Sequence, residues 1–155
     1  KELNFDNGLS IFKFGTNSGA FKDIRPDTSL LLNGKSFTVY NYHGDSLKSI
    51  FNVKVSDVSL LFYQDRLAKI IIKFGTKSND YTLEQFNRVQ QALEGKYGKY
   101  TGKLAMSGAV LLGGYRWRGK THSLEHTRFT SASGVKKRDR LTVGDISFEN
   151  KDLGY

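Results

Sequence analysis

Two short patterns match motifs of enzyme active sites, and the first is a phosphate-binding pattern. From Gly114 to Thr121 the chain reads GYRWRGKT, which fits GxxxxGK[ST]. In that motif backbone N–H groups wrap the phosphates, the lysine reaches the outer phosphates, the hydroxyl binds magnesium, and a helix follows the loop. Residues 122–129 alternate like a strand and show no helical stripe, and only 34 residues follow Thr121. We therefore interpret the segment as a strand, Tyr115–Arg118, that runs into a Gly–Lys turn.

The second pattern, HxxEH, comprises His122, Glu125 and His126 and matches an inverted zinc-protease motif. On a helix the two histidines would share one face and bind zinc, and the glutamate would activate a zinc-bound water. On a strand the same histidines lie about 13 Å apart, too far to bind one metal ion. Because the alternation favours a strand, we predict solvent-facing histidines and assign no metal site, no cofactor and no catalytic residue.

Basic side chains near the C-terminal end give the strongest lead to a ligand. The chain carries a net charge of +9, and eight basic but only two acidic residues lie between Tyr115 and Arg140. Seven of the basic residues are predicted to form one anion-binding face: Arg116, Arg118, Arg128, Lys136, Lys137, Arg138 and Arg140. Such a face would attract an acidic protein, an anionic envelope surface or another polyanion such as nucleic acid. The alternative is that this charge only keeps the protein soluble.

Aromatic and basic residues alternate in the predicted strand Tyr115–Arg118. A period of two places Tyr115 and Trp117 on one face and Arg116 and Arg118 on the other. The simpler interpretation buries the aromatic rings under a helix and leaves the arginines in solvent. Proteins that bind single-stranded nucleic acid usually present stacking aromatics on the same face as the charges, so the alternation argues against that ligand.

The elements that position these residues centre on residues 58–98. Val58–Tyr63 and Leu67–Phe74 are two β-rich runs separated by three polar residues, which predicts a hairpin. In the second run the apolar residues expected to share one buried face are Ala68, Ile70, Ile72 and Phe74.

Residues 82–97 give the clearest helix signal. Thr82 is placed as the N-cap, and Gln85 completes a capping box. The apolar stripe of this helix consists of Leu83, Phe86, Val89 or Gln90, Leu93 and Tyr97. Gly98 is placed to end the helix in a left-handed conformation. A helix with one apolar stripe needs a partner, and the neighbouring hairpin supplies one, so we predict a helix packed on a sheet.

The remaining segments predict further strands. Asn33–Gly34 is the strongest signal of a two-residue hairpin turn. Leu141 and Val143 are out of phase with Ile146 and Phe148, which predicts a β-bulge at Gly144–Asp145.

Length and composition indicate the class of fold and exclude some kinds of site. A chain of 155 residues that is 38% hydrophobic predicts a single domain over residues 1–155, of which 1–8 are expected to be frayed. The absence of cysteine excludes thiolate catalysis, cysteine zinc sites and disulfides. No apolar run reaches the roughly 18 residues that a membrane helix needs. The predicted fold is α+β, with a curved, mainly antiparallel sheet and one principal helix, at about 82–97, packed on one face.

The layout from Leu60 to Gly98, FYQDRLAKIIIKF followed by YTLEQFNRVQQALEGKYGK, resembles that of many small exported bacterial α+β proteins, mostly of unassigned function. The resemblance implies a helix on a curved antiparallel sheet and an extracytoplasmic location, and it carries over no site residue. The leading hypothesis is a non-enzymatic binding or envelope-associated module with an unknown ligand. The alternatives are a polyanion-binding module that uses the basic residues above, and a hydrolase that uses Lys120–Thr121 or the HxxEH set.

Overall fold

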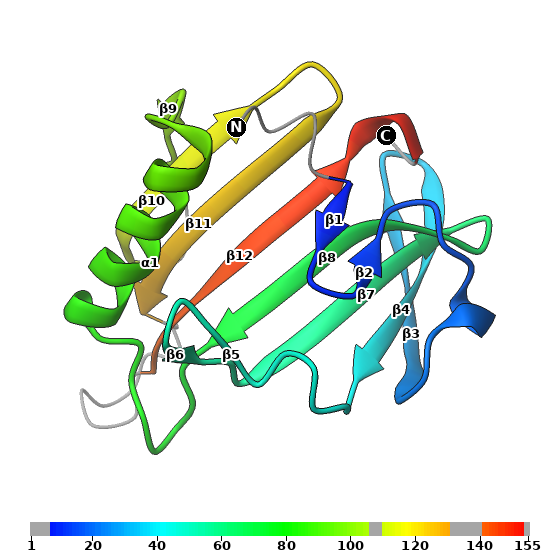
Figure 1. Cartoon of the computed structure of the whole chain (residues 1–155), viewed down its shortest axis with the longest axis horizontal. Helices are drawn as coiled ribbons and strands as arrows, with labels where there is room; N and C mark the ends of the chain where they lie inside the picture. Colours follow the sequence, from blue (N-terminus) through cyan, green and yellow to red (C-terminus); the bar gives the residue numbers. More distant parts are fainter. Residues whose placement is uncertain (1–6, 106–109, 131–140, 154–155) are drawn as a thin grey trace.

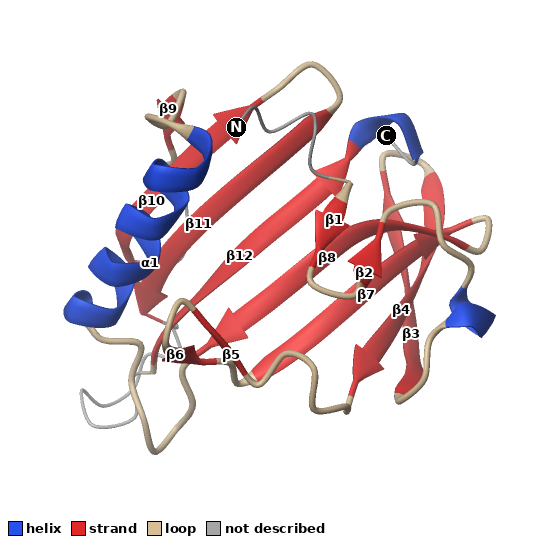
Figure 2. Ribbon diagram, in the orientation of Figure 1, coloured by secondary structure: helices blue, strands red, loops and turns tan. Residues whose placement is uncertain are grey.

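The computed structural model of the 155-residue chain describes residues 7–105, 110–130 and 141–153. An open eight-stranded antiparallel sheet carries the helix α1 (Leu83–Tyr97) on one face, as Figures 1 and 2 show. In spatial order the strands are β3 (Ile24–Leu32), β4 (Lys35–Tyr42), β7 (Asp57–Tyr63), β8 (Arg66–Phe74), β12 (Thr142–Asn150), β11 (His122–Thr130), β10 (Val110–Arg118) and β9 (Gly102–Lys103). The predicted α+β class, with one principal helix on a mainly antiparallel sheet, is confirmed.

The N-terminal and C-terminal halves of the chain meet in the middle of the sheet. The strands β3, β4, β7 and β8 form one half, and β12 pairs with β8 so that β11, β10 and β9 follow in reverse chain order. On the helix face, Ile146 lies opposite Ile72 and Phe148 opposite Ile70. The helix α1 connects β8 in the middle to β9 at one edge, and β3 forms the other edge (Figure 1).

Local signals in the sequence account for both ends of α1. The Thr82 side chain accepts a hydrogen bond from the Gln85 backbone N–H, and the Gln85 side chain accepts one from the Thr82 N–H, so the predicted capping box is confirmed. Gly98 ends the helix with φ +82° and ψ −169°, so φ is positive as predicted but ψ lies outside the left-handed helical region. Leu83 was expected in the apolar stripe, but it lies at the start of the helix and at the margin of the stripe, and it is 56% exposed.

The main core lies between the helix face of the sheet and the elements that cover it. Phe86, Val89 and Leu93 of α1 are buried against the sheet. Two short ribbons and two 3-10 turns complete the described elements: β1 (Gly8–Leu9) with β2 (Phe12–Lys13), β5 (Ser49–Ile50) with β6 (Val53–Lys54), η2 (Ser18–Ala20) and η4 (Lys151–Leu153). Side chains of both ribbons belong to the same apolar cluster as the helix, so the ribbons cover the same face.

The β7–β8 hairpin is confirmed, but one residue changes face. The pairing runs from Leu61 opposite Lys69 to Phe62 opposite Leu67 and so skips Ala68. The strict alternation predicted from the sequence is therefore interrupted at Ala68, which joins a smaller apolar cluster on the opposite face with Phe37 and Leu61. Leu67 takes a place in the main core instead.

Of the other local predictions, the hairpin turn at Asn33–Gly34 is confirmed and the β-bulge at Gly144–Asp145 is wrong. The Asn33–Gly34 turn is confirmed, with φ values of 51° and 75°. The prediction of a β-bulge at Gly144–Asp145 is wrong, because β12 pairs in continuous register with both neighbouring strands there. Gly8 belongs to β1, so the expected fraying of residues 1–8 is wrong at that position, and residues 1–6 lie outside the described part. No helix within the described ranges is long and apolar enough to cross a bilayer.

Candidate functional site

The segment that matches the phosphate-binding pattern is a β-hairpin. Residues 114–118 belong to β10, and the Gly119 N–H donates a 2.8 Å hydrogen bond to the His122 carbonyl, which closes a turn into β11. The predicted strand and turn are confirmed. Because a strand follows Thr121, no helix N-terminus faces this loop.

The HxxEH residues divide between the two faces of β11. His122 and His126 point toward the helix face and are 5% and 0% exposed, whereas Glu125 lies on the opposite face. The predicted strand is confirmed, but the expectation of solvent-facing histidines is wrong, because this face of β11 is covered by Phe14 and by α1. No group of three metal-ligating side chains occurs among the residues the structure describes.

His126 is held in a buried polar network. Its Nε2 lies 2.7 Å from the Tyr81 hydroxyl and its Nδ1 lies 2.9 Å from Gln90 Oε1. Burial lowers the pKa of His126 to about 3, so the ring is neutral at ordinary pH. Since Gln90 Oε1 can only accept, Nδ1 carries the proton and Nε2 accepts from the hydroxyl. The ring of Phe86 stacks on the imidazole at 4.2 Å. The network therefore joins α1, β11 and Tyr81, the residue before the N-cap of the helix, inside the core.

The predicted basic face is not continuous over the described residues. Arg116 and Arg118 lie on the face of the sheet opposite α1, which we call the outer face. Arg128 lies on the helix face, where its Nε donates a 2.8 Å hydrogen bond to the Tyr81 carbonyl. The physical reason is the period of two on β11, which puts position 128 on the same side as His126. The other predicted residues, Lys136, Lys137, Arg138 and Arg140, lie outside the described residues.

Charges on the outer face are largely paired across neighbouring strands. Among the described residues, ion pairs there include Arg116–Glu125 at 2.7 Å, Lys69–Glu149 at 3.8 Å and Lys73–Asp57 at 3.8 Å. Burial raises the pKa of the Asp145 carboxyl, which accepts a 2.9 Å hydrogen bond from the Thr127 hydroxyl. Among the described residues, the outer face is therefore mixed in charge.

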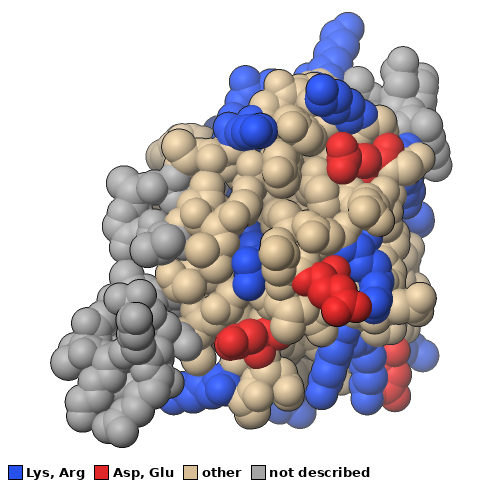
Figure 3. Space-filling model, turned by 90° about the vertical axis from the view of Figure 1, so that its left-hand side faces the viewer, with Lys and Arg blue, Asp and Glu red and all other residues tan. Residues whose placement is uncertain are grey.

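A different basic surface follows the edge of the sheet formed by β9 and β10. From residue 95 to residue 124 the chain contains no Asp or Glu and six basic residues. Five of them form what we call the basic edge: Lys96, Lys99, Lys103, Arg118 and Lys120. The sixth, Arg116, forms the ion pair with Glu125. Figure 3 views this side of the molecule and shows basic side chains along its upper rim, at the height of the C-terminal end of α1 and of β9.

Hydrogen bonds tie the end of α1 to this edge. The Trp117 Nε1–H donates to the Gly98 carbonyl at 2.8 Å, so the predicted burial of Trp117 under the helix is confirmed. The Thr101 N–H donates to the Arg116 carbonyl at 2.7 Å, and the Thr101 hydroxyl accepts from the Arg118 N–H at 3.0 Å. These contacts hold residues 98–101, which follow α1, against residues 116–118 of β10.

Tyrosine rings lie beneath two of the lysines. Lys96 Nζ is 5.3 Å from the ring centre of Tyr97, and Lys99 Nζ is 5.9 Å from that of Tyr100. The Tyr100 ring packs on Tyr115 of β10 at 4.4 Å. Sequence reasoning missed Lys96, Lys99 and Lys103, because it counted charge from residue 115 onward. The signal that would have found them is the acid-free stretch from residue 95 to residue 124.

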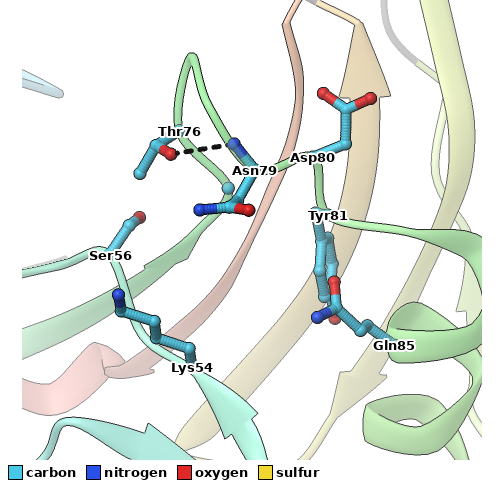
Figure 4. A pocket seen from close by; sticks show the side chains of 8 residues that line it. Lys54, Ser56, Thr76, Asn79, Asp80, Tyr81 and Gln85 are labelled. Carbon is cyan, nitrogen blue, oxygen red and sulfur yellow. Dashed lines mark hydrogen bonds between the residues drawn. The ribbon is translucent and has the colours of Figure 1, made fainter.

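A small pocket at the start of α1 is the second place where polar side chains converge (Figure 4). Its volume is about 60 Å³, and it is lined by Lys54, Ser56, Gly75, Thr76, Asn79, Asp80, Tyr81 and Gln85. Pockets for drug-sized ligands are roughly 300–1,000 Å³. Several of its polar groups already have partners. Gln85 caps the helix, the Asn79 N–H donates to the Thr76 hydroxyl at 3.2 Å, and the Ser56 hydroxyl donates to the Lys73 carbonyl at 3.0 Å. The pocket is therefore smaller than a site for such a ligand, and much of its polar lining is engaged in contacts within the protein.

Comparisons with known proteins identify no relative: no protein-family model matches the chain, and neither the curated proteins nor the solved structures contain a match. The resemblance to small exported bacterial proteins and the extracytoplasmic location stay predictions.

Proposed function

We propose that the protein is a non-enzymatic binding module whose basic edge engages a polyanion. The observation that carries the proposal is the folding of an acid-free stretch onto one edge of the sheet. Within the described ranges, Lys99, Lys103, Arg118 and Lys120 form no ion pair with a carboxylate, in contrast to Lys69, Lys73 and Arg116. Unneutralised cations raise the local potential and attract anions.

The helix dipole of α1 explains the position of only some cations of the basic edge. Lys96 lies in the last turn of α1, where a cation interacts favourably with the helix dipole. That interaction fades within one turn, so it does not account for Lys103 on β9 or for Lys120 in the β10–β11 turn. The charges follow an edge and surround no cavity, which favours an extended anion over a small one.

Binding of a fluorescent anionic oligomer, measured against salt concentration, tests the proposal. The test variant is Lys99→Glu/Lys103→Glu/Arg118→Glu, and the matched control, Lys13→Glu/Lys22→Glu/Arg25→Glu, changes three exposed cations of the N-terminal half. We expect the test variant to lose at least 10-fold in affinity and the control to lose much less. The slope of log K against log salt is negative, and its magnitude should decrease by about 2 to 3 in the test variant. Equal losses in both variants would mean that only net charge matters, and the proposal would be wrong.

A further inference from the structure

We propose that the free edge of β3 is a dimer interface, at which β3 pairs antiparallel with β3 of a second copy of the chain. This strand lies at the end of the sheet opposite the basic edge, with β4 as its neighbour. The proposal does not depend on the binding function above, because it rests on a different edge and on apolar side chains.

Exposed apolar side chains are concentrated on β3. Leu30 is 40% and Leu31 is 70% exposed, and they are adjacent residues near the C-terminal end of the strand. Of the large apolar side chains that are exposed in the described residues, the other three, Ile11, Leu83 and Leu112, are isolated in the chain. An exposed strand edge with apolar side chains is a surface on which another strand pairs, unless charge, proline or a bulge blocks it.

Such blocking features occupy the first half of β3 and are absent from the second. Pro26 and the charged Arg25 and Asp27 lie where the pairing with β4 shifts register between Pro26 and Thr28. Residues 28–32, TSLLL, contain no charge and no proline and pair in continuous register. The second half therefore remains open to a partner strand.

The Asn33–Gly34 turn sets which backbone groups face the open edge. In a hairpin with a two-residue turn, the flanking pair, here Leu32 and Lys35, exchanges both hydrogen bonds, and every second residue does the same. Leu30 therefore bonds inward to Phe37 of β4, its register partner. Ser29 and Leu31 direct their N–H and C=O groups outward, where a second strand can pair with them.

The strand complements itself about a two-fold axis at Leu30. In that register Ser29 of one copy lies opposite Leu31 of the other, which gives four backbone hydrogen bonds between the copies. Leu30 meets Leu30 of the second copy beside Phe37, so the smaller apolar cluster continues across the axis. The pairing brings no charged side chains of residues 28–32 together and closes with two copies, as an isologous contact does. This self-complementarity favours a second copy over an unrelated strand.

Oligomeric state tests the proposal, with Leu112 as a matched control because it is 44% exposed on β10, away from β3. Sedimentation should show a dimer for the wild-type protein and for Leu112→Lys, and a monomer for Leu30→Lys. Since the chain has no cysteine, Leu30→Cys should cross-link as a disulfide dimer under mild oxidation much faster than Leu112→Cys. The cysteine pair decides the question if Leu30→Lys does not fold. A wild-type monomer at all concentrations, or equal cross-linking of the two cysteine variants, would overturn the proposal.

Discussion

The Tyr81 hydroxyl and His126 Nε2 lie 2.7 Å apart inside the core, although 45 positions separate the two residues in the chain. Tyr81 is 1% exposed and stacks on Phe74 at 4.6 Å, while His126 is 0% exposed under Phe86. Burial raises the pKa of Tyr81 above its ordinary value, so both groups are neutral and their contact is a neutral hydrogen bond. This bond fixes the start of α1 to β11, and its properties lead to two predictions.

The first prediction is that acid destabilises the fold through His126. Its pKa in the folded protein is about 3, compared with 6.5 for an ordinary histidine. Between these values the unfolded chain binds more protons than the folded one, so the free energy of unfolding falls as pH decreases from 6.5 toward 3. The slope from one such group approaches about 1.4 kcal/mol per pH unit. Urea unfolding at pH 7, 5 and 4 should show a smaller decrease for His126→Phe than for the wild type.

His43 supplies the control for this measurement, because it is exposed on a loop after β4. The variant His43→Gln should retain the whole pH dependence of the wild-type protein. If His126→Phe and the wild type lose the same stability between pH 7 and pH 4, the histidine is not buried in the neutral form described here.

The second prediction concerns the hydroxyl of Tyr81. The variant Tyr81→Phe leaves His126 Nε2 as a buried acceptor without its donor, which costs about 1–3 kcal/mol of unfolding free energy. Tyr40→Phe is the control, since the Tyr40 ring packs on Phe62 and its hydroxyl has no partner among the described residues. Denaturant unfolding at neutral pH should separate the two variants, and similar stabilities would argue that the Tyr81 bond contributes nothing.

The third prediction is that Asp145→Asn stabilises the protein at neutral pH. Burial raises the pKa of Asp145, so the folded state resists ionisation, and the stability associated with this group is lost as pH rises through its folded pKa. Asparagine is neutral and can still accept the hydrogen bond of the Thr127 hydroxyl. We expect a higher melting temperature than the wild type at pH 7 and no gain at pH 3. A lower melting temperature at pH 7 would show that Lys69 and Lys73 outweigh the burial of the carboxylate.

Features that depend on a few neighbouring residues could be predicted from the sequence. The capping box of Thr82 and Gln85 and the Asn33–Gly34 turn are formed within four residues, so their signals are complete in the sequence. The face occupied by a strand residue depends on register, which partner strands set. For this reason Ala68 lies on the face opposite to the one predicted from its sequence position. The burial of His126 could not be predicted either, since it depends on where α1 crosses β11.

The candidate site was partly predictable for the same reason. Alternation correctly placed Trp117 in the core and Arg118 on the opposite face. The proximity of Lys99 to β10 depends on the hydrogen bond between Trp117 and the Gly98 carbonyl, which joins segments that local patterns treat separately. A count of acidic residues along the chain would have identified the acid-free stretch from residue 95 to residue 124, but not its position at one edge of the sheet.

The last prediction contrasts two glycines under the same substitution. A Cβ added at Gly144 of β12 would lie 2.3 Å from the Thr127 carbonyl oxygen and 2.4 Å from the Tyr81 ring. Because a backbone oxygen in a paired strand has little room to move, Gly144→Ala should force the tyrosine ring aside and cost about 1–3 kcal/mol or more. Gly95, inside α1, has open space around it, so Gly95→Ala should stabilise the protein by about 1 kcal/mol. Thermal unfolding of the two variants should therefore shift in opposite directions, and a tolerated Gly144→Ala would mean that β12 and Tyr81 are not packed as closely as the structure places them.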